Sequence, residues 1–176
     1  EIFDQLFYLN EQSKYYFKRK ISNVVFMGMG EPLLNYKNVV KAIKKMKMKC
    51  GLKFSAKKIT ISTSGIPKVI KQIANENLNC NLAVSLHSAI QKTRQIIMPF
   101  SEKFPLEDLI ESLKYWYKIT KKKILYEYII FDGINDNIEH IKALVKICKI
   151  LPCKVNFIEY NPTGEEIFRQ CKVEKL

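Results

Sequence analysis

The residues best suited to chemistry follow a short apolar segment near the start of the chain. Residues 24–27, Val-Val-Phe-Met, have the composition of a buried strand. Gly28, Gly30, Glu31 and Pro32 come directly after it. Glycine lets main-chain groups approach a ligand where a side chain would block it, and a proline favours an extended conformation at the residue before it. The pattern predicts either a Glu31 carboxylate held at the carboxyl end of a strand for binding, or a tight turn with a surface glutamate.

The elements that would position Glu31 alternate between helix and strand. Apolar periodicity and capping signals predict helices over residues 1–19, 35–51, 66–73, 106–117 and 138–148, and strands over 23–28, 57–63, 81–86, 124–131 and 154–160. Residues 88–105 are predicted to be an irregular loop with a short helix near Lys92. Because a helix lies between successive strands, the strands must run parallel. This α/β pattern fits one domain over residues 1–176, either a (β/α) barrel or an open doubly wound sheet.

Polar residues recur where each predicted strand ends. They are Gly30 and Glu31, then Ser62, Thr63 and Ser64, then Ser85 and His87, then Asp132 with Asn135, and finally Asn161. In a (β/α) barrel the carboxyl ends of the strands meet at one mouth. We therefore expect these side chains to share one site, although single serines at strand ends often serve only as local caps.

The overall charge favours a polyanionic partner. Lysine and arginine number 30 against 17 acidic residues, a formal net charge of +13, and RNA is the natural candidate. The alternative is that the excess of lysine reflects the amino-acid usage of the whole proteome. The lysines are spread along the chain, which fits this alternative. No apolar run is long enough to span a membrane, and we expect no signal peptide. Five cysteines without C-x-x-C spacing indicate a reducing cytoplasm and no self-contained metal site.

Five segments in order resemble the motifs of the radical S-adenosylmethionine rRNA methyltransferases of the RlmN/Cfr family. They are Val24 to Asn35 with its Gly28-Met29-Gly30-Glu31-Pro32, Ile61 to Gly65, Leu82 to His87, Tyr126-Glu127-Tyr128 with Asp132 and Asn135-Asp136, and Pro152 to Asn156 with Asn161-Pro162. Their spacing is compatible with the family over roughly residues 20–165. We favour the RlmN branch because it is the widespread housekeeping member.

The resemblance implies a partial (β/α)6 TIM-like radical SAM barrel with parallel strands, whose first strand and C-terminal part are missing. It implies S-adenosylmethionine as cofactor, with contacts from Gly30, Glu31, Ser62, Ser85, Leu86, His87 and Asn161. In the family, Gly30 and Glu31 would meet the methionine end and Asn161 the adenosine part. An ammonium group is well served by a fixed carboxylate and main-chain carbonyls.

The family's activity is methylation at C2 of adenosine in 23S rRNA and, in the RlmN branch, also in tRNA. In the family, a [4Fe-4S] cluster reductively cleaves S-adenosylmethionine to a 5′-deoxyadenosyl radical. This radical abstracts a hydrogen atom from a methyl group first carried on a cysteine. The resemblance further implies a cytoplasmic monomer served by a reductant such as flavodoxin.

Several family features do not occur in this sequence. The cluster motif C-x-x-x-C-x-x-C is missing, as are the methyl-carrying cysteine and the cysteine that resolves the protein–RNA adduct. Cys171 lies in surroundings unlike the family motif and is not assigned to it. We therefore expect the chain to be the central part of a longer enzyme, inactive by itself, with no catalytic residue and no metal ligand of its own.

Two rival functions stay open from the sequence. The first is a non-catalytic remnant that binds RNA through its basic surface. The second is a (β/α) barrel acting on a small phosphorylated substrate, with Ser62, Thr63 and Ser64 near the phosphate. The second rival predicts a glycine-rich phosphate loop late in the chain, and the sequence shows none.

Overall fold

The computed structural model describes residues 1–27, 30–48, 52–162, 164 and 167–171. Its helices are α1 (Ile2–Phe17), α2 (Tyr36–Lys47), α3 (Pro67–Asn75), α4 (Gln91–Ile97), α5 (Leu106–Thr120) and α6 (Ile138–Cys148), with short 3-10 helices η1 (Pro32–Asn35), η2 (Ala56–Lys58) and η3 (Pro99–Lys103). Its strands are β1 (Val24–Phe26), β2 (Ile59–Thr63), β3 (Asn81–Ser85), β4 (Ile124–Ile130) and β5 (Cys153–Glu159). No helix in the described part of the chain combines the length and apolar character needed to cross a bilayer.

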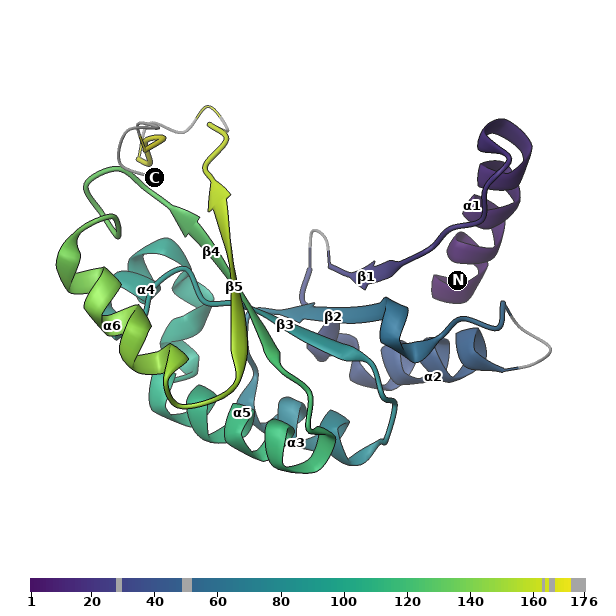
Figure 1. The fold of residues 1–176 in the computed structure, drawn as a ribbon, viewed down its shortest axis with the longest axis horizontal. Coiled ribbons are helices and arrows are strands. Elements are labelled where there is room, and N and C mark those ends of the chain that lie inside the picture. The colour runs from purple at the N-terminus through teal and green to yellow at the C-terminus, as the bar shows by residue number, and fades with distance from the viewer. Residues whose placement is uncertain (28–29, 49–51, 163, 165–166, 172–176) are drawn as a thin grey trace.

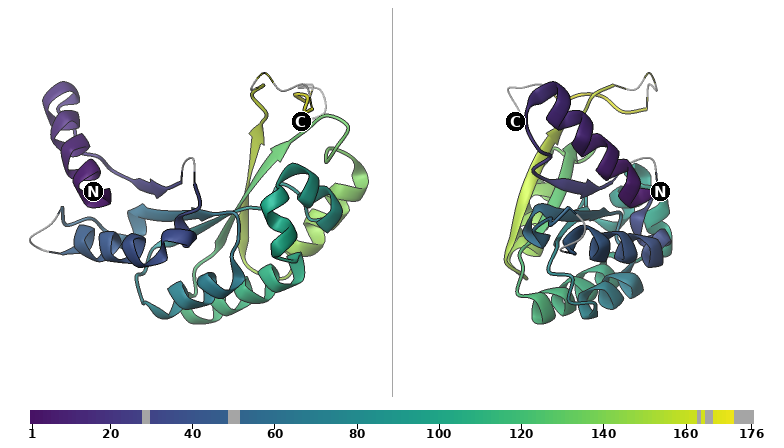
Figure 2. Two further views of the ribbon diagram at one scale, coloured as in Figure 1. Left: turned by 180° about the vertical axis from the view of Figure 1, so that it is seen from behind. Right: turned by 90° about the vertical axis from the view of Figure 1, so that its right-hand side faces the viewer.

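The strands form one parallel sheet in the order β1-β2-β3-β4-β5. The sheet is curved, and helices α2 to α6 lie along its outer side (Figures 1 and 2). A doubly wound sheet would reverse its strand order and carry helices on both faces, whereas a barrel adds each strand beside the last with all helices outside. The topology therefore confirms the parallel α/β prediction and selects an open part of a barrel.

The two faces of the sheet differ in chemistry. Ile61, Val84 and Tyr126 are fully buried and face the helices, where Ile70 and Trp116 pack into the same core. Most of the intervening residues carry small or polar side chains, namely Thr60, Ser62, Ala83, Ser85, Glu127 and Asn156, whereas Leu125 and Ile129 of β4 are apolar. Because side chains alternate along a strand, these groups share the concave face. The isoleucines of β2 thus face the helices, and Thr60 and Ser62 face the concave side.

Several predicted boundaries and local contacts differ from the structure. Asn35 precedes α2, but its side chain makes no capping hydrogen bond. Its side-chain oxygen Oδ1 accepts instead from the side-chain amide Nδ2 of Asn38 at 2.7 Å. Residues 88–105 contain the short helix predicted near Lys92, which is α4, and also the 3-10 helix η3, which was not predicted. Helix α2 ends at Lys47, and the helix end predicted at Gly51 lies outside the described residues.

The link between β2 and α3 depends on a glycine. Gly65 has φ +99°, and a Cβ atom there would lie 2.8 Å from a methyl group of Leu109 on α5. Only glycine accommodates both the backbone conformation and the close helix. The turn at Ser64-Gly65 therefore fixes the direction in which β2 ends.

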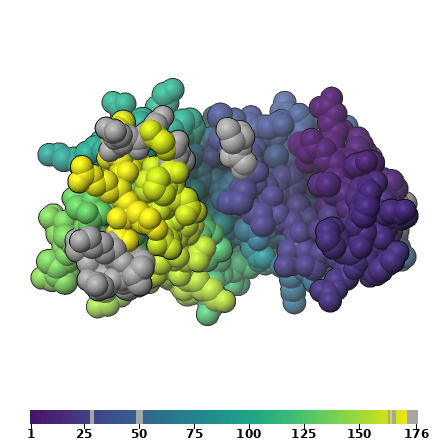
Figure 3. Space-filling view, turned by 90° about the horizontal axis from the view of Figure 1, so that it is seen from above, coloured from purple at the N-terminus to yellow at the C-terminus, as the bar shows by residue number. Residues whose placement is uncertain are grey.

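The described tail returns to the carboxyl end of β4. Gln170 pairs antiparallel with Phe131, and the ring of Phe168 lies 4.7 Å from that of Phe131 between centroids. The purple N-terminal and yellow C-terminal segments lie at opposite ends of the face in Figure 3. The two terminal segments of the described chain are therefore far apart in space.

Candidate functional site

Glu31 is fixed at the end of β1 by four hydrogen bonds. Its backbone is extended, with φ −109° and ψ 111°, as predicted for a residue before proline. One carboxylate oxygen accepts from the Leu33 amide at 2.9 Å and the Thr63 hydroxyl at 2.8 Å. The other accepts from the amide and hydroxyl of Ser64 at 2.7 and 2.6 Å. Glu31 therefore joins the carboxyl ends of β1 and β2, and its negative charge is held by neutral donors.

An open hollow of about 290 Å³ lies beside this carboxylate. It is lined by Met27, Gly30, Glu31, Pro32, Ser62, Thr63, Ser64, Ser85 and Phe100. The structure thus brings together Gly30, Glu31, Ser62 and Ser85, four of the predicted cofactor contacts. A Cβ atom at Gly30 would meet no atom within 4 Å, so the main chain there is open on the side where a ligand would approach. Gly28 lies outside the described residues.

Leu86 and His87 do not line this hollow. Leu86 is fully buried, and the His87 ring is turned toward β4, where its Nδ1 accepts from the Ile129 amide at 3.1 Å. That acceptor role places the ring proton on Nε2. Burial, with a smaller contribution from the charge of Arg94, lowers the pKa of His87 to about 4. Leu86 and His87 therefore support the carboxyl ends of the strands and do not line the hollow. Their contact with a cofactor stays a prediction.

Asn135 and Asn161 occupy the far half of the rim in very different ways. The buried Asn135 amide donates to the carbonyls of His87 at 2.6 Å and Ile129 at 2.8 Å, and its oxygen accepts from the Phe131 amide at 2.7 Å. Asn161 is exposed, follows β5 and does not line the hollow. Its predicted role at the adenosine part also stays a prediction.

Arg94 is a site residue that the sequence did not reveal. It is fully buried on α4, where its Nη2 donates to the carbonyl oxygens of Ser64 at 2.6 Å and Ser85 at 3.3 Å. No ion pair among the described residues includes it, and burial lowers its pKa to about 10. Arg94 therefore ties the ends of β2 and β3 together behind the hollow. The short helix predicted near Lys92 is present as α4, but the sequence pattern gave no sign that Arg94 would be buried.

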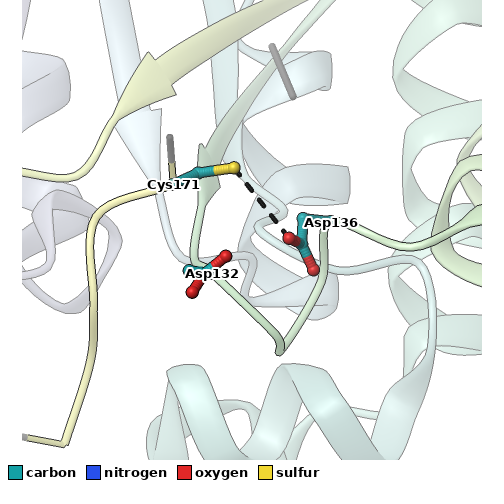
Figure 4. A group of neighbouring side chains, drawn as sticks. All are labelled: Asp132, Asp136 and Cys171. Atoms are coloured by element: carbon teal, nitrogen blue, oxygen red, sulfur yellow. Dashed lines mark hydrogen bonds between the residues drawn. The ribbon is translucent and has the colours of Figure 1, made fainter. Parts of the chain in front are cut away.

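Asp132, Asp136 and Cys171 form a second polar group, at the end of β4 (Figure 4). Their potential ligand atoms lie within 4.8 Å of one another, and the Cys171 thiol donates to the Asp136 carboxylate at 3.9 Å. Cys171 is distant from both aspartates in the sequence, which gave no indication that the three residues would meet. The Asp132 amide also donates to the Arg169 carbonyl at 3.0 Å. These contacts attach the returning tail to β4.

Known proteins provide an independent comparison. The model of the Radical SAM superfamily matches residues 8–145. The chain is 54% identical over 176 residues to the probable dual-specificity RNA methyltransferase RlmN of Flavobacterium johnsoniae, covering 100% of this chain and 50% of that protein. It is 55% identical over 174 residues to the protein of the same name from Christiangramia forsetii, covering 99% and 49%.

A solved structure agrees with these relatives. The crystal structure of a radical SAM methyltransferase from Sphaerobacter thermophilus superposes with a TM-score of 0.93 at 31% identity, over 98% of this chain and 50% of that one. The chain spans about half the length of the curated relatives it matches. From the superfamily match over most of its length and the shared partial barrel, the chain belongs to the radical SAM superfamily.

Proposed function

We propose that this chain is the S-adenosylmethionine-binding core of a dual-specificity 23S rRNA and tRNA adenine-C2 methyltransferase of the RlmN type. The observation that carries the proposal is the hollow at the carboxyl rim, which Gly30, Glu31, Ser62 and Ser85 line together. Four predicted contacts from three strands meet there. The relatives at 54–55% identity, named for RNA methylation, support the same activity.

The residues of the hollow suit the methionine end of S-adenosylmethionine. The four hydrogen bonds to the Glu31 carboxylate occupy its acceptor positions. The ammonium group would therefore be attracted by the negative charge of the carboxylate without displacing any of these hydrogen bonds. Main-chain carbonyls near the open Gly30 would accept from the ammonium. Ser62 and Ser85 would add hydroxyls from the next two strands, and Asn161 would bind the adenosine part from β5.

The superfamily also implies a [4Fe-4S] cluster, which together with S-adenosylmethionine supplies radical chemistry. The cysteine ligands of the C-x-x-x-C-x-x-C motif do not occur in this sequence. The role proposed for this chain is therefore to bind and orient S-adenosylmethionine, not to hold the cluster. We further propose that the complete enzyme is a cytoplasmic monomer that receives electrons from a reductant such as flavodoxin. No cysteine of this chain is assigned the methyl-carrying role.

The phosphate-binding alternative is disfavoured by the direction of the hydrogen bonds. The hydroxyls of Thr63 and Ser64 and the Ser64 amide all donate to Glu31. A phosphate at the same place would lose these donors and face a carboxylate of like charge. The remaining alternative is an RNA-binding remnant without catalysis.

One experiment separates the enzyme from the remnant. The gene product that contains residues 1–176 would be expressed anaerobically, its iron measured, and its activity assayed on a 23S rRNA fragment by mass spectrometry of nucleosides. The enzyme predicts about four irons per chain and 2-methyladenosine that depends on S-adenosylmethionine. RNA binding without iron and without 2-methyladenosine would instead identify a remnant.

A further inference from the structure

Lysines line the rim of the sheet opposite the hollow, where the strands begin. Lys20 precedes β1, Lys57 and Lys58 precede β2, and Lys122 precedes β4. Lys53 lies beside them, in the segment that leads into η2. We name these five residues, Lys20, Lys53, Lys57, Lys58 and Lys122, the lysine rim. The carboxyl rim, in contrast, carries Glu31.

The lysine rim has no carboxylate partner in the part of the chain that the structure describes. None of the ion pairs found among the described residues includes any of its five members. The Lys122 ammonium donates instead to the Asn79 carbonyl at 2.6 Å and to the Asn81 side chain, whose amide in turn donates to the Lys57 carbonyl. Burial lowers the pKa of Lys122, and the charge of Lys57 contributes. The charges of Lys57 and Lys122 are therefore close enough to repel one another, and no carboxylate among the described residues pairs with either of them.

A hollow of about 390 Å³ opens within this rim. Lys20, Lys53 and Lys58 line it together with Ser22 and Ser55. Ammonium groups beside hydroxyl donors are the side-chain contacts that proteins use for phosphate oxygens. Ile21, Leu52 and Phe54 also line the hollow, so phosphate groups would bind on the side formed by its lysines and serines.

Exposed aromatic rings lie at the neighbouring end of α1. Tyr15, Tyr16 and Phe17 expose 70%, 68% and 74% of their surface. Lys18, Arg19 and Lys20 follow directly in sequence, and the Lys18 ammonium lies 5.6 Å from the centroid of the Tyr15 ring. Lys14 of the same helix also lines the hollow. Aromatic side chains beside positive charge are typical of surfaces that stack unpaired RNA bases and bind the adjoining backbone. An acidic protein partner would not require the three rings.

The lysine rim is too far from the cofactor hollow to belong to it. Lys58 lies in one hollow and Thr63 in the other, and five residues of strand span about 16 Å. Only an extended ligand can reach both ends of the sheet. We propose that the lysine rim and the aromatic end of α1 bind the RNA backbone and unpaired bases at a distance from the methylated adenosine. The identification of the polyanion as substrate RNA rests on the proposed function.

The test compares two triple variants of this chain with equal charge. Lys20→Glu, Lys53→Glu and Lys58→Glu remove the hollow's charge, whereas Lys68→Glu, Lys118→Glu and Lys142→Glu change exposed lysines of α3, α5 and α6. Each set lowers the net charge of +13 by six. Binding of a fluorescein-labelled RNA stem-loop would be followed by anisotropy over a range of KCl concentrations. A Lys→Gln version of the first set replaces it if charge reversal lowers the melting temperature.

We expect the rim variant to bind the stem-loop at least tenfold more weakly, with a salt slope smaller by about two, since each phosphate contact contributes roughly 0.7 to 0.9. The control set should lose less than about threefold. Tyr15→Ala with Tyr16→Ala should weaken binding while leaving the salt slope unchanged. An equal loss in both triple variants, or no RNA binding by the unmodified chain, would overturn the proposal.

Calorimetric titration with S-adenosylmethionine separates this proposal from the proposed function. The unmodified chain and both triple variants should bind the cofactor equally, because the rim lies at the other end of β2. If none of the three binds it while the rim variant alone loses RNA, the cofactor assignment fails and the RNA surface stands.

Discussion

The two halves of the carboxyl rim use polar side chains in opposite ways. In the β1–β2 half, the Glu31 carboxylate is an acceptor whose donors come from Thr63 and Ser64, beside an open hollow. In the β3–β4 half, the Asn135 amide is buried and satisfies main-chain groups of neighbouring turns, including that of His87. Both halves carry motifs of the same family resemblance, and both follow strand ends.

This difference shows that a place at a strand end does not by itself define a binding residue. Glu31 brings a net charge to a surface that a ligand can reach, whereas the hydrogen bonds of Asn135 and the His87 ring are made within the protein. We therefore expect changes in the β3–β4 half to lower stability first, and changes in the β1–β2 half to lower cofactor affinity first. The following predictions test that division.

The largest effect is expected from Asn135→Ala. The substitution leaves the Phe131 amide and the carbonyls of His87 and Ile129 without their present partner. Each buried group left unpaired costs about 1–3 kcal/mol, so the free energy of unfolding should fall by about 3 kcal/mol or more in urea titrations. Asn156→Ala is the matched control, since that exposed amide donates to Glu127 at 2.7 Å and should cost less than about 1 kcal/mol. Equal losses in the two variants would contradict a supporting role for Asn135.

A similar effect is expected from acid. The pKa of His87 is lowered from 6.5 to about 4 by burial, so between these values the folded protein binds fewer protons than the unfolded chain. The stability that the neutral ring provides is complete above pH 6.5 and declines as the pH falls toward 4. The full shift corresponds to about 3 kcal/mol.

His87→Asn should remove this part of the acid sensitivity. Asparagine tolerates the left-handed backbone of His87, with φ 53°, and its side-chain oxygen can accept from the Ile129 amide without titrating. Thermal melts of both proteins at several pH values between 7 and 4 measure the difference. If the melting temperatures fall in parallel with pH, the buried ring is not the cause.

The sequence predicted the parts of this molecule that depend on local pattern and topology. Alternation in β2 separated Ile61 from Ser62 because strand side chains alternate between faces. The α/β order forced parallel strands, and parallel strands bring Gly30, Ser62 and Ser85 to one rim. The five-stranded parallel sheet and the hollow that these residues line follow directly from those two patterns.

Contacts between distant segments could not be predicted in the same way. Arg94 is buried because α4 directs it toward the carbonyls of Ser64 and Ser85, and no local pattern encodes that direction. The types of Thr63 and Ser64 suited either a phosphate or a carboxylate, and only the position of Glu31 decided between them. The group of Asp132, Asp136 and Cys171 depends on the return of the tail.

The most direct test of the account is a calorimetric titration of S-adenosylmethionine into the complete protein that contains residues 1–176 and into its Glu31→Ala and Asn161→Ala variants. Glu139→Ala, a change to an exposed carboxylate on α6, is the control. The account predicts that Glu31→Ala weakens cofactor binding at least tenfold, or about 1.4 kcal/mol, and Asn161→Ala severalfold, while Glu139→Ala has no effect. Unchanged affinity in both Glu31→Ala and Asn161→Ala would contradict the assignment of the carboxyl rim as the cofactor site.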